Sequence, residues 1–154
     1  MNEGCFMKKL VLLGLATLLT SMSLTATAEV KPFEAVEYRQ GIFKAFKWNF
    51  GPMADMVKGK TDFNAEEFNK HAERLEQLSF MPWEAFIAGT YAKSTAALPK
   101  IQNEQDDFKK EIAKLQKAVA NLAAAAKTNE MKNIGPAFGQ AGQSCKSCHD
   151  KYKD

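Results

Sequence analysis

The sequence predicts an all-α protein that folds as an antiparallel, up-down-up-down four-helix bundle. Four stretches of the 154-residue chain repeat apolar residues at alternating steps of three and four, which places those residues on one face of a helix. The links between the stretches are mostly short, which favours antiparallel neighbours. A hydrophobic content of 45% and a charged content of 25% are ordinary for one globular domain.

Residues 1–28 have the features of an export signal. Lys8 and Lys9 precede an apolar run, and small residues then lead to an Ala-Thr-Ala sequence that ends at Ala28. This order predicts a signal peptide that is cleaved after Ala28. The apolar run is shorter than the roughly 20 residues of a membrane span, which disfavours the alternative of a membrane anchor. We therefore expect an exported domain over residues 29–154, with no membrane segment.

The first helix is expected over residues 34–57, and its inner face is apolar at every position except Arg39. The second helix is expected from Asn64, which is a good N-cap, and Phe63 and Phe68 are spaced as a hydrophobic staple. The inner face of the first helix consists of Val36, Arg39, Phe43, Phe46, Phe50, Met53 and Val57.

Two prolines and a glycine interrupt the helical pattern over residues 80–102, which predicts an irregular connection there. The third helix is expected over residues 104–127, with Asn103 as its cap. Its stripe is unbroken and consists of Phe108, Ile112, Leu115, Val119, Leu122 and Ala126.

The fourth helix is expected from residue 130 to the end, and its apolar stripe includes Cys145 and Cys148. Whatever these cysteines bind therefore lies in the core. Together with His149 they form a C-x-x-C-H sequence, the signature of covalent haem attachment. Two thiols three residues apart can reach the two vinyl groups of one porphyrin, and the histidine that follows becomes the axial iron ligand. The sequence thus predicts one covalently bound haem c.

Three other uses of these residues are less well supported. A zinc site needs four ligands, and only His71 is left to complete one. A thioredoxin-like redox pair needs a βαβ context, which is missing here. A plain disulfide leaves the adjacent His149 unexplained. Charges of both signs are interspersed along the chain, which argues against nucleic acid as a partner.

The chain resembles the cytochrome c′ family over nearly all of residues 29–154. The haem motif alone is common to many families, and its place at the extreme C-terminus, combined with Tyr-Arg-Gln in the first helix, is more specific. The resemblance implies a periplasmic protein that dimerises through its first two helices. The matching segments are Glu37-Tyr38-Arg39-Gln40, Met56-Val57-Lys58-Gly59, Pro82-Trp83-Glu84-Ala85-Phe86, Ala137-Phe138-Gly139 and the stretch from Ser144 to Tyr152.

In this family the distal residue follows the Arg-Gln pair by three positions, which the resemblance places at Phe43. A phenyl ring has no lone pair for iron, so we expect high-spin, five-coordinate iron with an apolar distal face. Such a pocket offers no hydrogen bond to dioxygen and suits nitric oxide and carbon monoxide better. The alternative is that Phe43 is one more core aromatic beside Phe46 and Phe50.

Four further residues are candidate haem contacts. Arg39 interrupts an apolar stripe and needs a partner, for which we expect a haem propionate, or else a nearby glutamate. Gln40 is expected to assist, as the resemblance implies, and Thr90 is expected at the haem edge. Lys153 lies one helical turn after His149, in the proximal pocket, where the family often has arginine; a frayed, solvated lysine is the alternative.

The sequence and the resemblance together lead us to expect a periplasmic haem protein, not an enzyme, that binds NO and CO and sequesters NO. A peroxidase needs a distal histidine or acid–base pair that the sequence does not supply. The alternative function is a periplasmic electron-transfer cytochrome with an unknown redox partner and no exogenous ligand.

Overall fold

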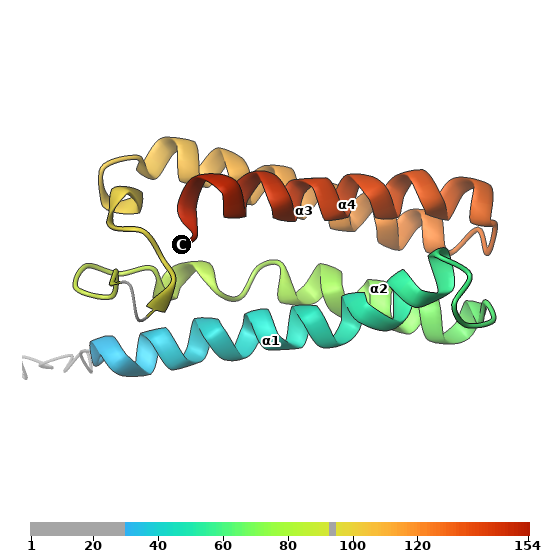
Figure 1. The fold of residues 1–154 in the computed structure, drawn as a ribbon, viewed down its shortest axis with the longest axis horizontal. Helices are drawn as coiled ribbons and strands as arrows, with labels where there is room; N and C mark the ends of the chain where they lie inside the picture. Colours follow the sequence, from blue (N-terminus) through green and yellow to red (C-terminus); the bar gives the residue numbers. More distant parts are fainter. Residues whose placement is uncertain (1–29, 93–94) are drawn as a thin grey trace, which may run out of the picture.

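The structure is a computed structural model that describes residues 30–92 and 95–154, so the predicted signal peptide lies outside the described residues. Its four α-helices are α1 (Pro32–Val57), α2 (Ala65–Leu78), α3 (Gln105–Ala126) and α4 (Met131–Tyr152). Figure 1 shows that α1 and α3 run in one direction while α2 and α4 run in the other. The predicted antiparallel four-helix bundle is confirmed.

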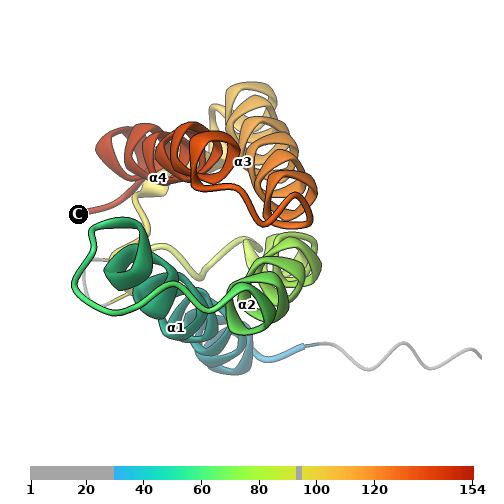
Figure 2. The same ribbon diagram turned by 90° about the vertical axis from the view of Figure 1, so that its right-hand side faces the viewer.

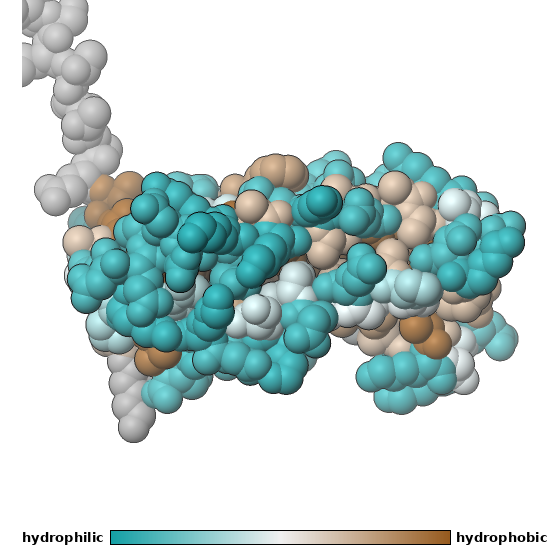
Figure 3. Space-filling model, turned by 90° about the horizontal axis from the view of Figure 1, so that it is seen from above, coloured by the Kyte–Doolittle hydropathy of each residue, from teal (hydrophilic) through white to brown (hydrophobic). Residues whose placement is uncertain are grey.

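The bundle is seen nearly end-on in Figure 2, where α1 lies beside α2 and α3 lies beside α4. Each helix turns its apolar stripe inward, because burying that stripe removes it from water. The core includes predicted inner residues from each of the four helices, among them Met53, Phe68, Leu75, Leu122 and Ile134, which are at most 1% exposed. Figure 3 shows mainly hydrophilic side chains on the face that α3 and α4 present to solvent.

The start of α2 agrees with the sequence. The Asn64 side chain accepts a hydrogen bond of 3.1 Å from the backbone N–H of Glu67, which satisfies one of the free donors of the first turn. The rings of Phe63 and Phe68 lie 5.7 Å apart, as the predicted staple requires. Before this point, α1 ends at Val57, and Gly59 adopts a positive φ of 67° that reverses the chain.

The start of α3 differs from the sequence-based prediction. Asn103 is not its cap; Glu104 occupies the N-cap position, with no side-chain cap. The reason lies in the preceding turn, because Asn103 has helical backbone angles and ends the 3₁₀ helix η3 (Pro99–Gln102). Asp106 and Asp107 in the first turn of α3 provide negative charge where the helix dipole favours it.

The connection between α2 and α3 is irregular, as predicted, and contains the 3₁₀ helices η1 (Trp83–Ala85) and η3. It is tied to the C-terminus by an isolated antiparallel bridge between Ala97 and Lys153. The backbone N–H of Leu98 donates to the carbonyl of Tyr152 at 3.0 Å. These bonds fasten the last turn of α4 beside the long loop. No helix among the described residues combines the length and apolarity that a bilayer span needs.

Candidate haem-binding site

The two cysteines of the C-x-x-C-H sequence lie on the inner side of α4, and both are free and half-buried. Cys145 packs against the main core cluster, and Cys148 packs against a second cluster near the chain end. Burial raises the pKa of Cys145 and raises that of Cys148 to about 11. A raised pKa disfavours the thiolate that a thioredoxin-like redox pair needs.

His149 follows on the flank of α4 that faces α1. Seven residues separate it from Gly142, which keeps both on nearly the same side of the helix; the ring of Phe50 on α1 lies against Gly142. The side chain of His149 reaches the surface, yet desolvation is the main cause that lowers its pKa, followed by the nearby charge of Lys153. Lys153 is exposed and caps α4, with its backbone N–H on the carbonyl of His149.

The offset between α1 and α4 places Phe43 at the height of His149. The ring of Phe50 stacks on that of Phe138 with the centroids 4.3 Å apart, and its tip lies 3.6 Å from the position that a Cβ of Gly142 would take. The contact of Phe50 with Gly142 sets the level at which the two antiparallel helices meet. Phe43 lies seven residues before Phe50 on α1, and His149 lies seven residues after Gly142 on α4. Because both helices rise by about 1.5 Å per residue, both positions lie about 10 Å from the contact of Phe50 with Gly142, in the same direction.

Aromatic rings surround Phe43. Its ring centroid lies 5.8 Å from that of Phe46, 5.9 Å from Trp83 and 6.4 Å from Phe86. Phe43 and Cys145 both pack against the main core cluster, so the predicted distal residue and a predicted attachment residue belong to the same core. None of these three neighbouring rings carries an atom that ligates iron.

Arg39 is buried, at 2% exposure, and its guanidinium binds the long loop. It donates to the carbonyl of Ala85 at 3.1 Å and to Thr90 twice, at 2.7 Å to the hydroxyl and at 2.5 Å to the carbonyl. Its charge also lies 4.7 Å from the centre of the Phe86 ring. No carboxylate forms an ion pair with Arg39 within the described ranges, which contradicts the glutamate alternative. Two of its five N–H groups remain outside these three bonds.

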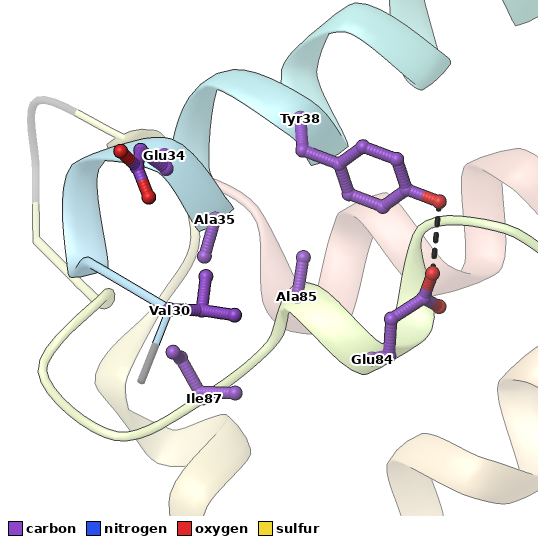
Figure 4. A pocket seen from close by; sticks show the side chains of 7 residues that line it. All are labelled: Val30, Glu34, Ala35, Tyr38, Glu84, Ala85 and Ile87. Atoms are coloured by element: carbon purple, nitrogen blue, oxygen red, sulfur yellow. Dashed lines mark hydrogen bonds between the residues drawn. The ribbon is translucent and has the colours of Figure 1, made fainter. Parts of the chain in front are cut away.

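A pocket brings Gln40 and Thr90 together. Both line a pocket of about 390 Å³ at the N-terminal end of α1, together with Val36 and Gly89. Another pocket, of about 290 Å³, lies between the start of α1 and residues 84–87 of the loop (Figure 4). It has an apolar floor, and the hydroxyl of Tyr38 donates to Glu84 at its edge. None of the predicted site residues lines this other pocket.

The structure shows a buried carboxylate beside the motif that the sequence analysis missed. Glu111 on α3 is 1% exposed and accepts hydrogen bonds from Ser147 and Lys151 of α4. A signal for it exists in the sequence, because Glu111 stands three residues after Phe108 and four before Leu115, at a position of the apolar stripe.

The structure places His71 against α1. Its Nδ1 is 3.0 Å from the side-chain oxygen of buried Asn49, which joins α2 to α1. Burial lowers the pKa of His71, so the ring is neutral at pH 7. Within the described part of the chain, no three His, Cys, Asp or Glu side chains are grouped to hold a metal ion.

Comparisons with known proteins agree with this geometry. Residues 34–153 match the family model described as Cytochrome C′. Cytochrome c′ of Alcaligenes xylosoxydans xylosoxydans is 37% identical over 123 residues, which cover 80% of this chain and 95% of that protein. The structure of cytochrome c prime from Shewanella frigidimarina superposes with a TM-score of 0.79 at 42% identity and covers 82% of this chain and 99% of that one.

A third relative has been solved with a bound ligand. A nitric oxide complex of a variant of cytochrome c prime from Alcaligenes xylosoxidans superposes with a TM-score of 0.77 at 35% identity, covering 82% of this chain and 98% of that one. The family match extends over nearly all of the described residues, and the relatives share both the sequence and the bundle. The chain therefore belongs to the cytochrome c′ family, which implies that it carries a c-type haem.

Proposed function

We propose that this chain is a periplasmic haem protein that binds nitric oxide and carbon monoxide at five-coordinate, high-spin iron, and that it sequesters nitric oxide. One haem c is held covalently by Cys145 and Cys148, and His149 is its axial ligand. Residues 1–28 direct export and are removed. The observation that carries the proposal is the position of Phe43, level with His149 on the facing helix and enclosed by aromatic rings.

The residues present suit a haem. Two free thiols three residues apart face apolar clusters, and a histidine follows them directly. Arg39 is a buried cation with no carboxylate partner in the described residues and with two uncommitted N–H groups, which suits a propionate. Gln40 and Thr90 at the neighbouring pocket would support that contact, and Lys153 beside His149 belongs to the proximal side.

The same geometry argues against an internal sixth ligand. Met53 and Met56 are the buried methionines of α1, and Met53 lies ten residues beyond Phe43, about 15 Å along the helix. His71 is engaged with Asn49. An iron with one open, apolar side binds diatomic gases that need no hydrogen-bond donor. A relative from Alcaligenes has been solved as a nitric oxide complex, which supports the same ligand here.

A homodimer through α1 and α2 is part of this proposal. Trp48 on α1 is 75% exposed, and a large aromatic side chain of this kind is typical of the centre of an interface. Sedimentation of the wild-type protein and of Trp48→Lys tests this point, because a lysine at the interface centre disfavours association. A monomeric wild type would contradict the dimer.

The decisive experiment measures absorption and electron paramagnetic resonance spectra of the purified protein, ferric and ferrous, with and without each gas. High-spin iron that forms a five-coordinate nitrosyl is expected. Low-spin iron that binds neither gas would contradict the proposal and favour the electron-transfer alternative. Mass spectrometry of the intact protein checks the attachment, since Cys145→Ser with Cys148→Ser loses the covalent haem mass that the wild type carries.

A further inference from the structure

The buried carboxylate of Glu111 connects α3 to the attachment motif at two points. Its Oε2 accepts a hydrogen bond of 3.0 Å from the hydroxyl of Ser147, the third residue of the C-x-x-C-H sequence. Its Oε1 accepts a bond of 2.8 Å from the ammonium of Lys151. The two donors are four residues apart and lie on one flank of α4. Cys148 and His149 lie between them in the chain.

This flank is opposite to the one that carries His149. Ser147 and His149 are two residues apart, which corresponds to a rotation of about 200° around the helix. A carboxylate that holds Ser147 and Lys151 against α3 therefore limits how far the last turn of α4 can rotate, and rotation is what would redirect the His149 ring.

Burying a charged carboxylate costs free energy, which indicates that Glu111 has a specific role at this position. A charged group removed from water is tolerated when hydrogen bonds to cations satisfy it. Lys114, on α3 itself, donates a third bond of 2.8 Å to Oε1. The bonds from Lys114 and Lys151 lower the pKa of Glu111 to about 2, so it stays ionised at neutral pH. Of the three donors, only Lys114 makes no link to α4.

We propose that Glu111 is a positioning residue for the axial ligand: by holding Ser147 and Lys151, it sets the rotation of the last turn of α4 and thereby the orientation of the His149 imidazole. The inference rests on the proposed role of His149 as axial ligand. It adds a residue of α3 to the determinants of the iron–histidine bond, through a contact that does not involve His149 itself.

The test is the iron–histidine stretching band in the resonance Raman spectrum of the ferrous holoprotein. Glu111→Ala and Ser147→Ala are expected to shift this band in the same direction or to broaden it. Lys151→Met is expected to cause the same change to a smaller extent. Lys114→Met is the matched control, because it removes a positive charge from the same carboxylate and leaves both links to α4 in place. Its band is expected to match the wild type.

The outcomes separate the inference from the proposed function. A wild-type band that stays unchanged in Glu111→Ala and Ser147→Ala overturns the inference and leaves the axial role of His149 intact. A Lys114→Met band that shifts as far as that of Glu111→Ala also overturns it, because charge rather than position then controls the ligand. If the wild type lacks the band, His149 is not the axial ligand, and both that part of the proposed function and the inference are refuted. If Glu111→Ala yields no holoprotein, Ser147→Ala and Lys151→Met decide.

Discussion

Replacing Arg39 with alanine is expected to loosen the long loop and to lower the free energy of unfolding substantially. The guanidinium makes three hydrogen bonds to residues 46 and 51 positions away in the chain, all of them in buried surroundings. It is thus the main polar link between α1 and this loop. Residues Ala85 and Thr90, which accept the bonds, are 5% and 2% exposed.

The magnitude follows from these contacts. A hydrogen bond with one charged partner contributes about 1.5–3 kcal/mol, and the cation's return to water in the unfolded chain offsets part of the total. The carbonyl of Ala85 loses the donor that Arg39 supplies, whereas the carbonyl of Thr90 keeps a bond from Thr95. A net loss of about 3 kcal/mol is expected for Arg39→Ala. Thr90→Val, which removes one of the three bonds, should cost about 1–2 kcal/mol.

The assay is urea unfolding of the holoprotein, followed by far-ultraviolet circular dichroism. Amide hydrogen exchange over residues 86–92 localises the effect, because exchange there should accelerate in Arg39→Ala. Thr90→Ser is the control, since it keeps the hydroxyl that accepts from Arg39. An Arg39→Ala protein within about 0.5 kcal/mol of the wild type, the usual range for surface substitutions, would show that Arg39 does not hold the loop.

Three further predictions test the site. Phe43→Met is expected to give a low-spin absorption spectrum, because a thioether can ligate iron, while Phe43→Leu stays high-spin; a high-spin Phe43→Met would contradict the placement of this residue. His71→Ala should leave the absorption spectrum unchanged and cost about 1 kcal/mol in urea unfolding, through the lost bond to Asn49. A changed spectrum would make His71 a ligand. Because the pKa of Glu111 is lowered from 4.5 to about 2 in the folded protein, its stabilising effect is present above pH 4.5 and is lost as the pH falls towards 2. Urea midpoints measured from pH 5 to pH 2 should therefore fall more steeply in the wild type than in Glu111→Gln, and equal slopes would refute this account.

The helices and the motif could be predicted from the sequence because both are local patterns. An apolar residue every three or four positions identifies the inner face of a helix whatever lies opposite. The cap at Asn64 and the staple of Phe63 with Phe68 likewise involve residues that are close in the chain. The failure at Asn103 has a local cause too, since a 3₁₀ turn ends there and competes for the same residue.

The partners of Arg39 could not be predicted in this way. The sequence shows only that a cation interrupts an apolar stripe, and a propionate or a glutamate is the natural expectation. In the structure the long loop folds back over α1 and supplies carbonyl and hydroxyl oxygens in place of a glutamate. Loop carbonyls carry no sequence signal, because every residue has one.

By itself, therefore, the sequence determined the four helices, their inward faces and the residues able to attach a haem, since each depends on spacing within a single segment. Only the tertiary structure decided that Phe43 lies level with His149 and that Glu111 meets Ser147 across two helices. Those relations depend on how far one helix is shifted and rotated against another. That shift follows from contacts such as that of Phe50 with Gly142, between residues far apart in the chain, which no local periodicity records.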